Sequence, residues 1–407
     1  MSASANPIII VTGANGGVGY GICQRLLFQL ATPHPSDALP QEKLVQIWGP
    51  ALEKELPLSN VEGLTLIMAC RSALRAEKAR SELYAAMDAH VESQKKLPNY
   101  DGHAEKFRKN LVIAIHSLDL ASITSVFRFG AEMAQKYPYI SHLICNAGVA
   151  SFINIEWFRA IKQCFTEPIT AVTAPRYYRQ REGEVSADGL GWVWQCNVFG
   201  HYCLFRSLQP LLAASKSALG ARVIWTSSLE ADPSFYDSED WQLTKTAHSY
   251  ESSKYQVDIM ATHLDRLALQ GARGDGVVIR HVVTQPGVAH SEIAIALTGA
   301  FLNVVKLITF YLARWLNSPN HTIQVYKAAI AAVHLSFISL AFLPAVTTPA
   351  STKQPPVRFG AETDRWGDER VGTTPVKEWD AHVKEGIELL DKCDNLYNTF
   401  LADQDSV

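Results

Sequence analysis

Tyr250 and Lys254 lie four residues apart in the segment YESSK. Residues at positions i and i+4 of a helix share one face, so this phenol and this ammonium can point at the same ligand. A free tyrosine has a pKa of about 10, and a nearby cation favours its ionised form. The spacing predicts a proton-transfer site in which the lysine lowers the pKa of the tyrosine. A hydroxyl at Ser228 and an amide at Asn197 precede this pair and strengthen the interpretation.

A glycine-rich segment near the N-terminus has the composition of a phosphate-binding turn. The run TGANGGVG, residues 12–19, separates a β-branched run at 8–11 from a helical pattern at 19–30. Glycine lets the backbone turn sharply beside a pyrophosphate, and the N-terminus of the next helix offers free N–H groups. This strand–turn–helix context predicts a dinucleotide site. Its cofactor-binding residues are expected to be Gly13, Asn15, Gly17, Val18 and Gly19.

The residues after the second expected strand indicate which dinucleotide binds. Sites that prefer NAD place an acidic residue there, and this carboxylate would repel a 2′-phosphate. This chain has Cys70 at that position and Arg71 beside it. A guanidinium can bind phosphate through a forked pair of charge-assisted hydrogen bonds. We therefore expect NADPH/NADP as the cofactor; the alternative is that Arg71 is a solvated residue at the head of a helix.

Other polar residues follow expected strands, at the edge where open α/β sheets bind ligands. Asp119 follows the third strand, and Asn146 and Gly148 follow the fourth. Each of them alone could also be an ordinary turn residue, because Asn, Asp and Gly favour turns.

Strand-like and helical segments alternate over the first two-thirds of the chain. Apolar or β-branched runs predict six strands, at residues 8–11, 64–69, 111–115, 142–145, 222–226 and 277–283. Continuous apolar runs are typical of strands that are buried on both faces of a parallel sheet. The alternation predicts one open parallel α/β sheet with helices on both faces, followed by a helical C-terminal extension. Its last element is an expected amphipathic helix at 377–401.

Composition excludes several classes of protein. The 37 Lys+Arg and 40 Asp+Glu give a formal net charge of −3, without the basic excess that is usual in nucleic-acid-binding proteins. The 13 His and 7 Cys show no metal-ligand spacing, so we expect no metal site. Scattered cysteines in odd number indicate reduced thiols in a cytosol-facing protein. Residues 1–7 show no secretion-signal pattern.

Two apolar regions raise the question of a membrane. Residues 293–305 carry no charge, but Lys306 and Arg314 interrupt the run before it reaches the about 20 residues of a membrane span. Two compatible interpretations are open: an interfacial helix that touches a membrane, and a lid over an apolar pocket. Residues 328–342 are expected to form a buried helix.

These motifs, in this order, resemble those of the short-chain dehydrogenase/reductase family. The matching segments are TGANGGVG, the aspartate of SLDLAS, NAG, the asparagine of CNVFGH, the second serine of WTSS, YESSK and Pro286-Gly287. The resemblance implies a Rossmann-type doubly wound sheet. It also implies hydride transfer between a nicotinamide and a carbonyl or alcohol.

The resemblance assigns roles to four side chains. It implies that Tyr250 is the acid/base and that Lys254 binds the nicotinamide ribose and lowers the pKa of the tyrosine. It further implies that Ser228 orients the carbonyl and that Asn197 holds a water of the proton relay. The remaining cofactor contacts that it implies are Asp119, Asn146, Gly148, Pro286, Gly287, Val288 and Ser291.

The flanking sequence resembles a narrower group. Residues 197–212, 222–231, 249–260 and 362–371 look like fungal 3-keto-steroid reductases of sterol C-4 demethylation, and they are similar to 17β-hydroxysteroid dehydrogenase type 7 of animals. This resemblance implies NADPH-dependent reduction of the C-3 ketone of a sterol. It also implies a complex with other C-4 demethylation enzymes and peripheral attachment to the cytosolic face of the endoplasmic reticulum membrane, with the lipid droplet as a second location.

Two alternatives stay open at this point. One is a reductase of the same fold that acts on another lipophilic carbonyl, such as a 17-ketosteroid or retinal. The other is a nucleotide-binding scaffold of a sterol-enzyme complex. We expect three parts in the chain: a catalytic core with insertions at 1–291, a substrate lid with membrane-contact helices at 292–352, and a C-terminal extension at 353–407.

Overall fold

A single eight-stranded sheet organises the chain. The computed structural model describes residues 6–41, 61–217, 219–271, 277–290, 295–339 and 355–405. The strands lie in the spatial order β10-β9-β8-β7-β4-β1-β2-β3, and every neighbouring pair is parallel except β9 and β10. Their bounds are β1 Ile8–Thr12, β2 Leu64–Cys70, β3 Leu111–Ser117, β4 His142–Cys145, β7 Ala221–Thr226, β8 Ile279–Gln285, β9 Val357–Thr363 and β10 Glu369–Pro375.

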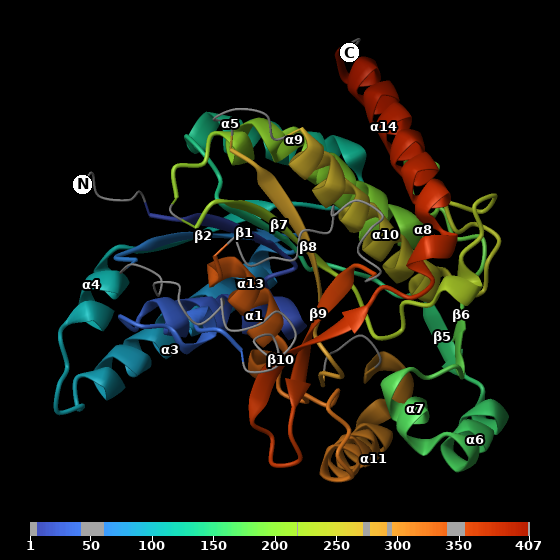
Figure 1. Ribbon diagram of the computed structural model, residues 1–407, viewed down its shortest axis with the longest axis horizontal. Helices are drawn as coiled ribbons and strands as arrows, with labels where there is room; N and C mark the ends of the chain where they lie inside the picture. Colours follow the sequence, from blue (N-terminus) through green and yellow to red (C-terminus); the bar gives the residue numbers. More distant parts are fainter. Residues whose placement is uncertain are drawn as a thin grey trace.

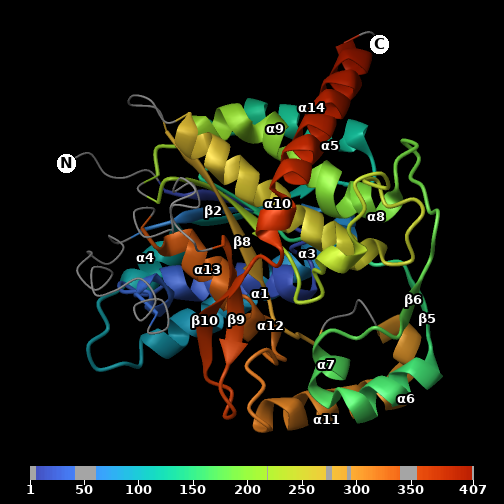
Figure 2. The ribbon, with the colours of Figure 1, turned by 45° about the vertical axis from the view of Figure 1, so that its right-hand side comes forward.

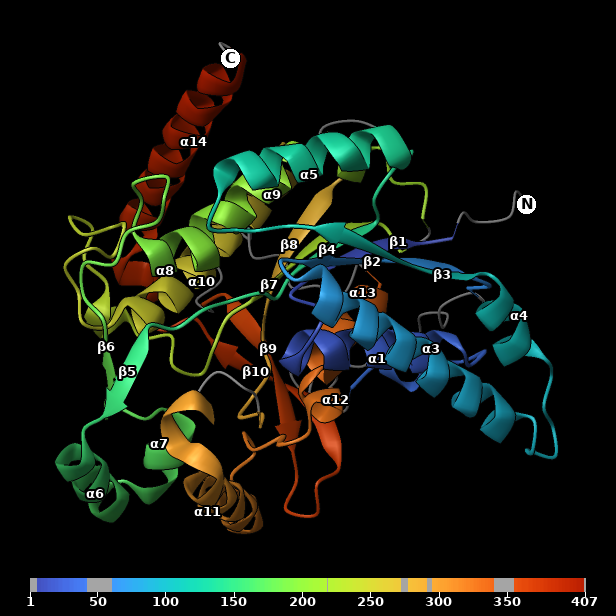
Figure 3. The same ribbon diagram turned by 180° about the vertical axis from the view of Figure 1, so that it is seen from behind.

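Helices cover both faces of this sheet (Figure 1). One face carries α5 Ile123–Lys136, α9 Gly200–Ala213 and α10 Ser249–Gln270, with α14 Val383–Asp405 packed on α10. The other face carries α1 Gly17–Leu30, α3 Ala73–Gln94, α12 Val325–Ala328 and α13 Ile330–Phe337. Figure 3 shows α3 from behind, with α4 His103–Lys109 at its end. The predicted doubly wound α/β fold is therefore confirmed.

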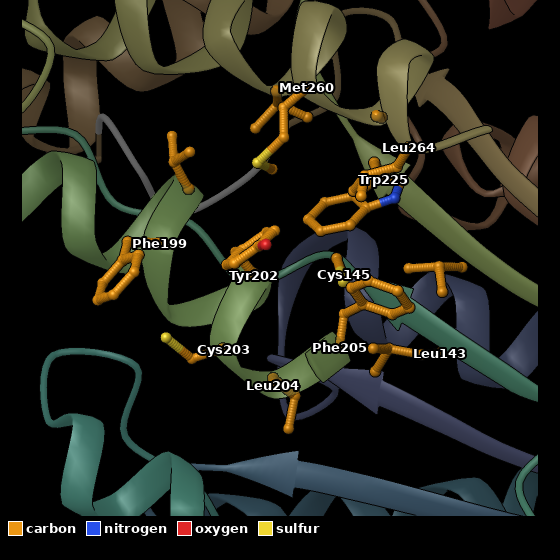
Figure 4. Packing of buried hydrophobic residues seen from close by; sticks show 14 of the residues in the cluster. Leu143, Cys145, Phe199, Tyr202, Cys203, Leu204, Phe205, Trp225, Met260 and Leu264 are labelled. Carbon is orange, nitrogen blue, oxygen red and sulfur yellow. The ribbon is translucent and has the colours of Figure 1, made fainter. Parts of the chain in front are cut away.

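Each face of the sheet has its own apolar core. Along β7, Trp225 packs into the cluster beneath α9 and α10, whereas its neighbour Ile224 packs into the cluster beneath α1 and α13. Figure 4 shows the first cluster, in which Phe205 of α9 and Met260 of α10 surround Trp225. Successive side chains of a strand point to opposite faces. Because both faces of the sheet are covered by an apolar core, the strands are continuous apolar runs in the sequence.

The strands β9 and β10 were not predicted, because they carry charge. Arg358 and Glu362 of β9 are both buried, and the Arg358 guanidinium lies 3.2 Å from a carboxylate oxygen of Asp258 in α10. Burial of a charge is tolerated when the charge is paired. Such a strand lacks the apolar run that identifies the others.

The insertion at 151–191 forms a small separate unit. It contains β5 Phe152–Ile155, α6 Trp157–Thr166, α7 Pro168–Thr173 and β6 Tyr178–Gln180, of which β5 and β6 pair antiparallel. Helix α11, Ile295–Trp315, contacts α7 and β5, and Figure 2 shows it beside α6 and α7. Within the described ranges, no helix has the length and apolarity that crossing a bilayer requires.

Two expected segments lie partly outside the described residues. Of the apolar stretch at 328–342, the described part contains the last residue of α12 and the whole of α13, and the side chains of α13 are buried, as predicted. Of the surface excursion expected at 31–63, residues 42–60 are outside the described residues.

Candidate active site

The glycine-rich turn joins β1 to α1. Gly13 has a φ of +66°, a conformation that glycine adopts without strain, and its N–H donates to the carbonyl oxygen of Ala69 at 2.9 Å. A Cβ on Gly19 would lie 2.3 Å from the carbonyl oxygen of Gly13, so only glycine lets α1 pack onto the turn. A Cβ on Gly16 would meet no atom within 4 Å, so this part of the turn is open to a ligand.

Buried polar side chains hold this turn against β4. The hydroxyl Oγ1 of Thr12 accepts hydrogen bonds from the N–H groups of Asn146 and Ala147, each at 2.9 Å. The Asn146 amide donates to the carbonyl oxygen of Thr12 at 3.0 Å. Nε2 of His201 lies 3.0 Å from Thr12 Oγ1, and burial lowers the pKa of His201 to about 3, so its ring is neutral. Sequence analysis missed His201, because an isolated histidine in a helix carries no signal.

A cleft of about 600 Å³ runs from this turn along the carboxyl ends of the strands. It opens beside β1 and β4, where the strand order reverses and where such sheets bind ligands. Most of the predicted cofactor residues line it: Gly13, Asn15, Gly17, Val18, Arg71, Asp119, Asn146, Gly148, Tyr250, Lys254 and Pro286.

The remaining predicted cofactor residues lie elsewhere. Gly19 packs beneath the turn. Gly287 and Val288 line a second pocket instead of the cleft. Ser291 lies outside the described residues.

One end of the cleft is basic. Arg71 lines it together with Arg75 and Lys78 of α3, which sequence analysis missed although the three follow helical spacing. Cys70 stands where an acid would select NAD, and burial raises the pKa of its thiol to about 11, so it carries no charge. Glu82 of α3 also lines the cleft, but the three cations outnumber it and no carboxylate replaces Cys70. This end therefore fits a phosphate.

Tyr250 lies in the first turn of α10 at the other end of the cleft. Gln180 of β6 anchors this turn, since its Oε1 accepts from the Tyr250 N–H at 2.9 Å and from Ser249 Oγ at 3.1 Å. Ser228 lies close to Tyr250, and its hydroxyl lowers the pKa of the phenol. The N–H of Glu230 donates to Ser228 Oγ at 3.1 Å and thereby orients that hydroxyl.

Burial and nearby carboxyls set the pKa of Tyr250 in this structure, and Lys254 is not among the groups that shift it, so the lowering of this pKa by Lys254 stays a prediction. Burial raises this pKa above its usual value, the nearby Glu230 carboxyl raises it further when it is ionised, and the Ser228 hydroxyl only partly opposes the two effects. Lys254 Nζ lies 5.8 Å from the centre of the Tyr250 ring and donates to the carbonyl oxygen of Thr226 at 2.8 Å. Tyr250 is therefore a neutral phenol, the form that can donate a proton.

Lys254 is a buried cation beside the cleft. Burial lowers its pKa to about 8, and the carboxylate of Asp258 partly opposes this effect. A Cβ on Gly148 would lie 3.5 Å from Lys254 Nζ, so the backbone after β4 passes close to the ammonium. The ammonium is therefore held between β7, α10 and the cleft.

Asn197 lies in a π-helical turn, Gln195–Phe199, between α8 Trp192–Trp194 and α9. Such turns interrupt α-helices frequently at functional sites. Asn197 Oδ1 accepts from the Val149 N–H at 2.8 Å, and Nδ2 donates to the Val149 carbonyl oxygen at 2.9 Å and to Ser253 Oγ at 3.0 Å. The side chain thus joins the loop after β4 to α10. Its predicted role in holding a water stays a prediction.

An apolar pocket of about 360 Å³ borders Tyr250 on its other side. Its walls come from the 151–191 insertion and from α11, and they include Phe152, Trp157, Val172, Tyr177, Leu302 and Phe310. Four residues line both cavities: Val18, Ser227, Tyr250 and Pro286. The phenol therefore stands in the wall between a polar cleft and an apolar pocket.

A phenol beside a serine hydroxyl, at the edge of a doubly wound sheet with a glycine-rich turn, is the arrangement that the resemblance to short-chain dehydrogenases/reductases implies. No model of a known protein family matches the chain. Individual relatives place it more narrowly. It is 30% identical to the 3-keto-steroid reductase of Schizosaccharomyces pombe over 368 residues, which cover 90% of each chain. The chain belongs to the 3-keto-steroid reductase family.

Further relatives and one solved structure show the extent of the similarity. The chain is 33% identical to the 3-keto-steroid reductase of Eremothecium gossypii, over 70% of this chain and 82% of the relative. It is 29% identical to that of Saccharomyces cerevisiae, over 93% and 97% of the two chains. The Pseudomonas aeruginosa RhlG/NADP active-site complex is similar at a TM-score of 0.48 and 17% identity, covering 82% of this chain and 90% of that chain.

Proposed function

We propose that this protein reduces the C-3 ketone of a sterol intermediate to a 3β-hydroxyl, with NADPH as the reductant, in ergosterol-type sterol biosynthesis. The position of Tyr250 carries the proposal, because it lines both the dinucleotide cleft and the apolar pocket. A ketone in the pocket and a nicotinamide in the cleft would meet at this phenol. The names of the relatives, 3-keto-steroid reductases, support the choice of ketone.

The cleft fits NADPH. The open backbone at Gly16 and the N-terminus of α1 suit the pyrophosphate, and α1 has no acidic residue in its first turn to oppose an anion. Arg71 and Arg75 beside the uncharged Cys70 suit the 2′-phosphate. Lys254 lines the cleft, and the resemblance assigns it to the nicotinamide ribose. When bound, the nicotinamide supplies the hydride.

Reduction requires a proton donor at the carbonyl oxygen, and the chain provides one. Negative charge grows on this oxygen during reduction, and the hydroxyls of Ser228 and Tyr250 would stabilise it by hydrogen bonds that tighten in the transition state. Tyr250 then donates its proton as a general acid. Its raised pKa keeps the phenol protonated at neutral pH. We assign the return of the proton to Lys254 and to a water near Asn197.

The apolar pocket suits a sterol, which is apolar except at its oxygen. Its polar side chains include Ser228, Glu230 and Tyr250, which gather at the end next to the cleft. Leu302, Val305 and Phe310 of α11 form one wall. We assign α11, within residues 292–352, the role of the substrate lid.

We further propose that α6 and α11 dock on a membrane surface. Phe158 and Phe165 of α6 are each 85% exposed, and Leu312 and Trp315 of α11 are 52% and 61% exposed. Both helices contact α7, and both lie at the same end of the molecule (Figures 1 and 2). Exposed apolar patches mark interaction surfaces. A membrane there would deliver a lipid substrate directly to the pocket.

The cytosolic face of the endoplasmic reticulum, or the lipid droplet, is the membrane that the family resemblance implies. The same resemblance implies a complex with other enzymes of sterol C-4 demethylation. Both statements are proposals for this chain. Both are tested by comparing the wild type with variants of Phe158 and Phe165. The measurement is the amount of protein, and of other C-4 demethylation enzymes, that co-purifies from a fungal membrane fraction.

One assay tests the proposed function. Purified protein is mixed with NADPH or NADH and with a 3-keto sterol, a 17-ketosteroid or retinal, and the loss of reduced-nicotinamide absorbance is followed. We expect turnover of the 3-keto sterol with NADPH and identification of the 3β-alcohol as the product. Faster turnover of a 17-ketosteroid or retinal would reassign the substrate. Binding of NADPH without turnover of any ketone would favour the scaffold.

A further inference from the structure

Glu230 is a buried carboxyl group two residues after Ser228, and the reaction as described above does not use it. It is the only carboxyl among the described residues that line the apolar pocket. Its Oε2 atom is buried and has no hydrogen-bond partner among the described residues. A buried polar atom without a partner is unusual and needs an explanation.

The groups that face Glu230 come from two elements. Tyr250 and Glu251 approach from α10, and Tyr177 and Tyr178 approach from the β6 side. When Glu230 is ionised, its charge raises the pKa of all three phenols. No described residue forms an ion pair with Glu230, although Lys306 of α11 and Cys164 of α6 line the same pocket.

Glu251, the other carboxyl beside Tyr250, differs because it has partners. Its Oε2 accepts from Gln180 Nε2 at 2.5 Å, and its Oε1 lies 3.2 Å from His248 Nδ1. Burial and the charge of Glu251 together raise the pKa of Glu230 to about 8. Glu230 is thus a neutral carboxylic acid at neutral pH.

We propose that Glu230 is a positioning residue for ketone reduction: in its neutral form it lets negative charge develop on Tyr250 and on the substrate oxygen, and in its ionised form it slows the proton transfer. The proposal rests on the proposed reductase function. In the step concerned, the O–H bond of Tyr250 breaks, a new O–H bond forms on the substrate oxygen, and the phenolate keeps the electron pair. Glu230 exchanges no atom in this step.

The physical reason is repulsion between like charges in a site shielded from water. A carboxylate at Glu230 would stand beside a newly formed phenolate, and each would disfavour the other. A neutral acid removes this repulsion. The N–H of Glu230 also holds Ser228 Oγ at 3.1 Å, so the same residue fixes the position of the second hydroxyl.

The test compares the pH dependence of kcat in the wild type and in Glu230→Gln, with the 3-keto sterol and saturating NADPH. Glutamine has a similar shape and does not ionise. Lys254 also titrates near pH 8 but is present in both enzymes, so only the ratio of the two profiles reports Glu230. For one group that ionises near pH 8, the ratio of the Glu230→Gln kcat to the wild-type kcat should rise about tenfold from pH 7 to pH 9.

A matched control is Glu132→Gln. Glu132 lies 2.7 Å from Lys136 Nζ and 3.0 Å from His116 Nδ1, and it lines neither cavity. The ratio of its kcat to the wild-type value should stay constant over the same pH range. A constant ratio for Glu230→Gln as well would overturn the proposal.

Two further measurements keep the proposal testable if Glu230→Gln fails to fold. Glu230→Asp retains an ionisable group and should retain the alkaline loss of kcat; an alkaline-resistant Glu230→Asp enzyme would overturn the proposal. Infrared difference spectra of the wild type and of a folded variant without this carboxyl should show a protonated carboxyl band near pH 7 in the wild type alone. Absence of this band would overturn the neutral state of Glu230, whether or not the wild type reduces a ketone. Failure of the wild type to reduce any ketone would instead refute the reductase function.

Discussion

The two cavities on either side of Tyr250 are built in different ways. The walls of the cofactor cleft are held by hydrogen bonds of buried groups, such as those of Thr12 with Asn146 and His201. The walls of the apolar pocket come from inserted segments that meet through apolar contacts and expose aromatic rings to solvent. We therefore expect the fold to hold the cofactor and the inserted segments to select the substrate. Mutations should separate the two functions.

Tyr250 belongs to both cavities, so its replacement should have the largest effect. Tyr250→Phe removes the proton donor but keeps the ring, and general acid catalysis contributes about 10²–10⁴-fold to a rate. We expect kcat for ketone reduction to fall by that factor, while the Kd of NADPH, measured by nucleotide fluorescence, stays within about twofold.

Tyr177→Phe provides the matched control for that experiment. Tyr177 lines only the apolar pocket, and its hydroxyl donates to the carbonyl oxygen of Ala171 at 2.9 Å. Its replacement should alter the KM of the ketone more than kcat. Near-native turnover in Tyr250→Phe would overturn the assignment of the acid and with it the division between the two cavities.

A smaller effect is expected at the basic end of the cleft. Hydrogen bonds to charged groups contribute about 1.5–3 kcal/mol, which corresponds to about 10–100-fold in binding. Arg71→Ala should weaken NADPH binding by this factor and leave NADH binding unchanged, and Cys70→Asp should add to the preference for NADH. Titration of the nicotinamide fluorescence measures both cofactors.

Arg80→Ala serves as the control on the same helix. Arg80 pairs with Glu77 at 2.6 Å and does not line the cleft. If Arg71→Ala lost NADPH and NADH affinity equally, Arg71 would support the fold of the cleft and would not bind the 2′-phosphate. Substrate KM should not change in either variant, because neither arginine lines the apolar pocket.

The cleft was predictable from sequence because its residues follow strands directly. Gly13, Asp119 and Asn146 each occupy the first positions after a parallel strand, and parallel strands bring these positions to one edge. The apolar pocket was only partly predictable. The apolar run at 293–316 indicated a lid, but its partners at 151–191 lie more than a hundred positions earlier and show no periodic pattern that would join them to it.

The pKa of Tyr250 shows a different limit of sequence analysis. The distance of four residues to Lys254 indicates a cation nearby, but it says nothing about burial or about the Glu230 carboxyl, and these two effects determine the direction. The long-range ion pair of Arg358 with Asp258 was invisible for the same reason. Local spacing identifies the reacting groups, whereas their protonation states depend on the packed surroundings.

Mutations on the outer surface of α6 should affect membrane binding without affecting catalysis, and theirs is the smallest of the three predicted effects. Burial of a phenylalanine side chain contributes about 1.5–3 kcal/mol, so Phe158→Glu or Phe165→Glu should each weaken binding to vesicles of neutral lipid by about tenfold or more. Turnover of a detergent-dispersed 3-keto sterol should stay within about twofold of the wild type, because neither side chain lines the pocket.

Leu97→Glu is the matched control. Leu97 is 53% exposed beyond the end of α3, and its replacement should not affect vesicle binding. If Phe158→Glu and Phe165→Glu bound vesicles as the wild type does, α6 would not be a docking surface. Lost turnover in detergent would instead show that α6 shapes the pocket itself.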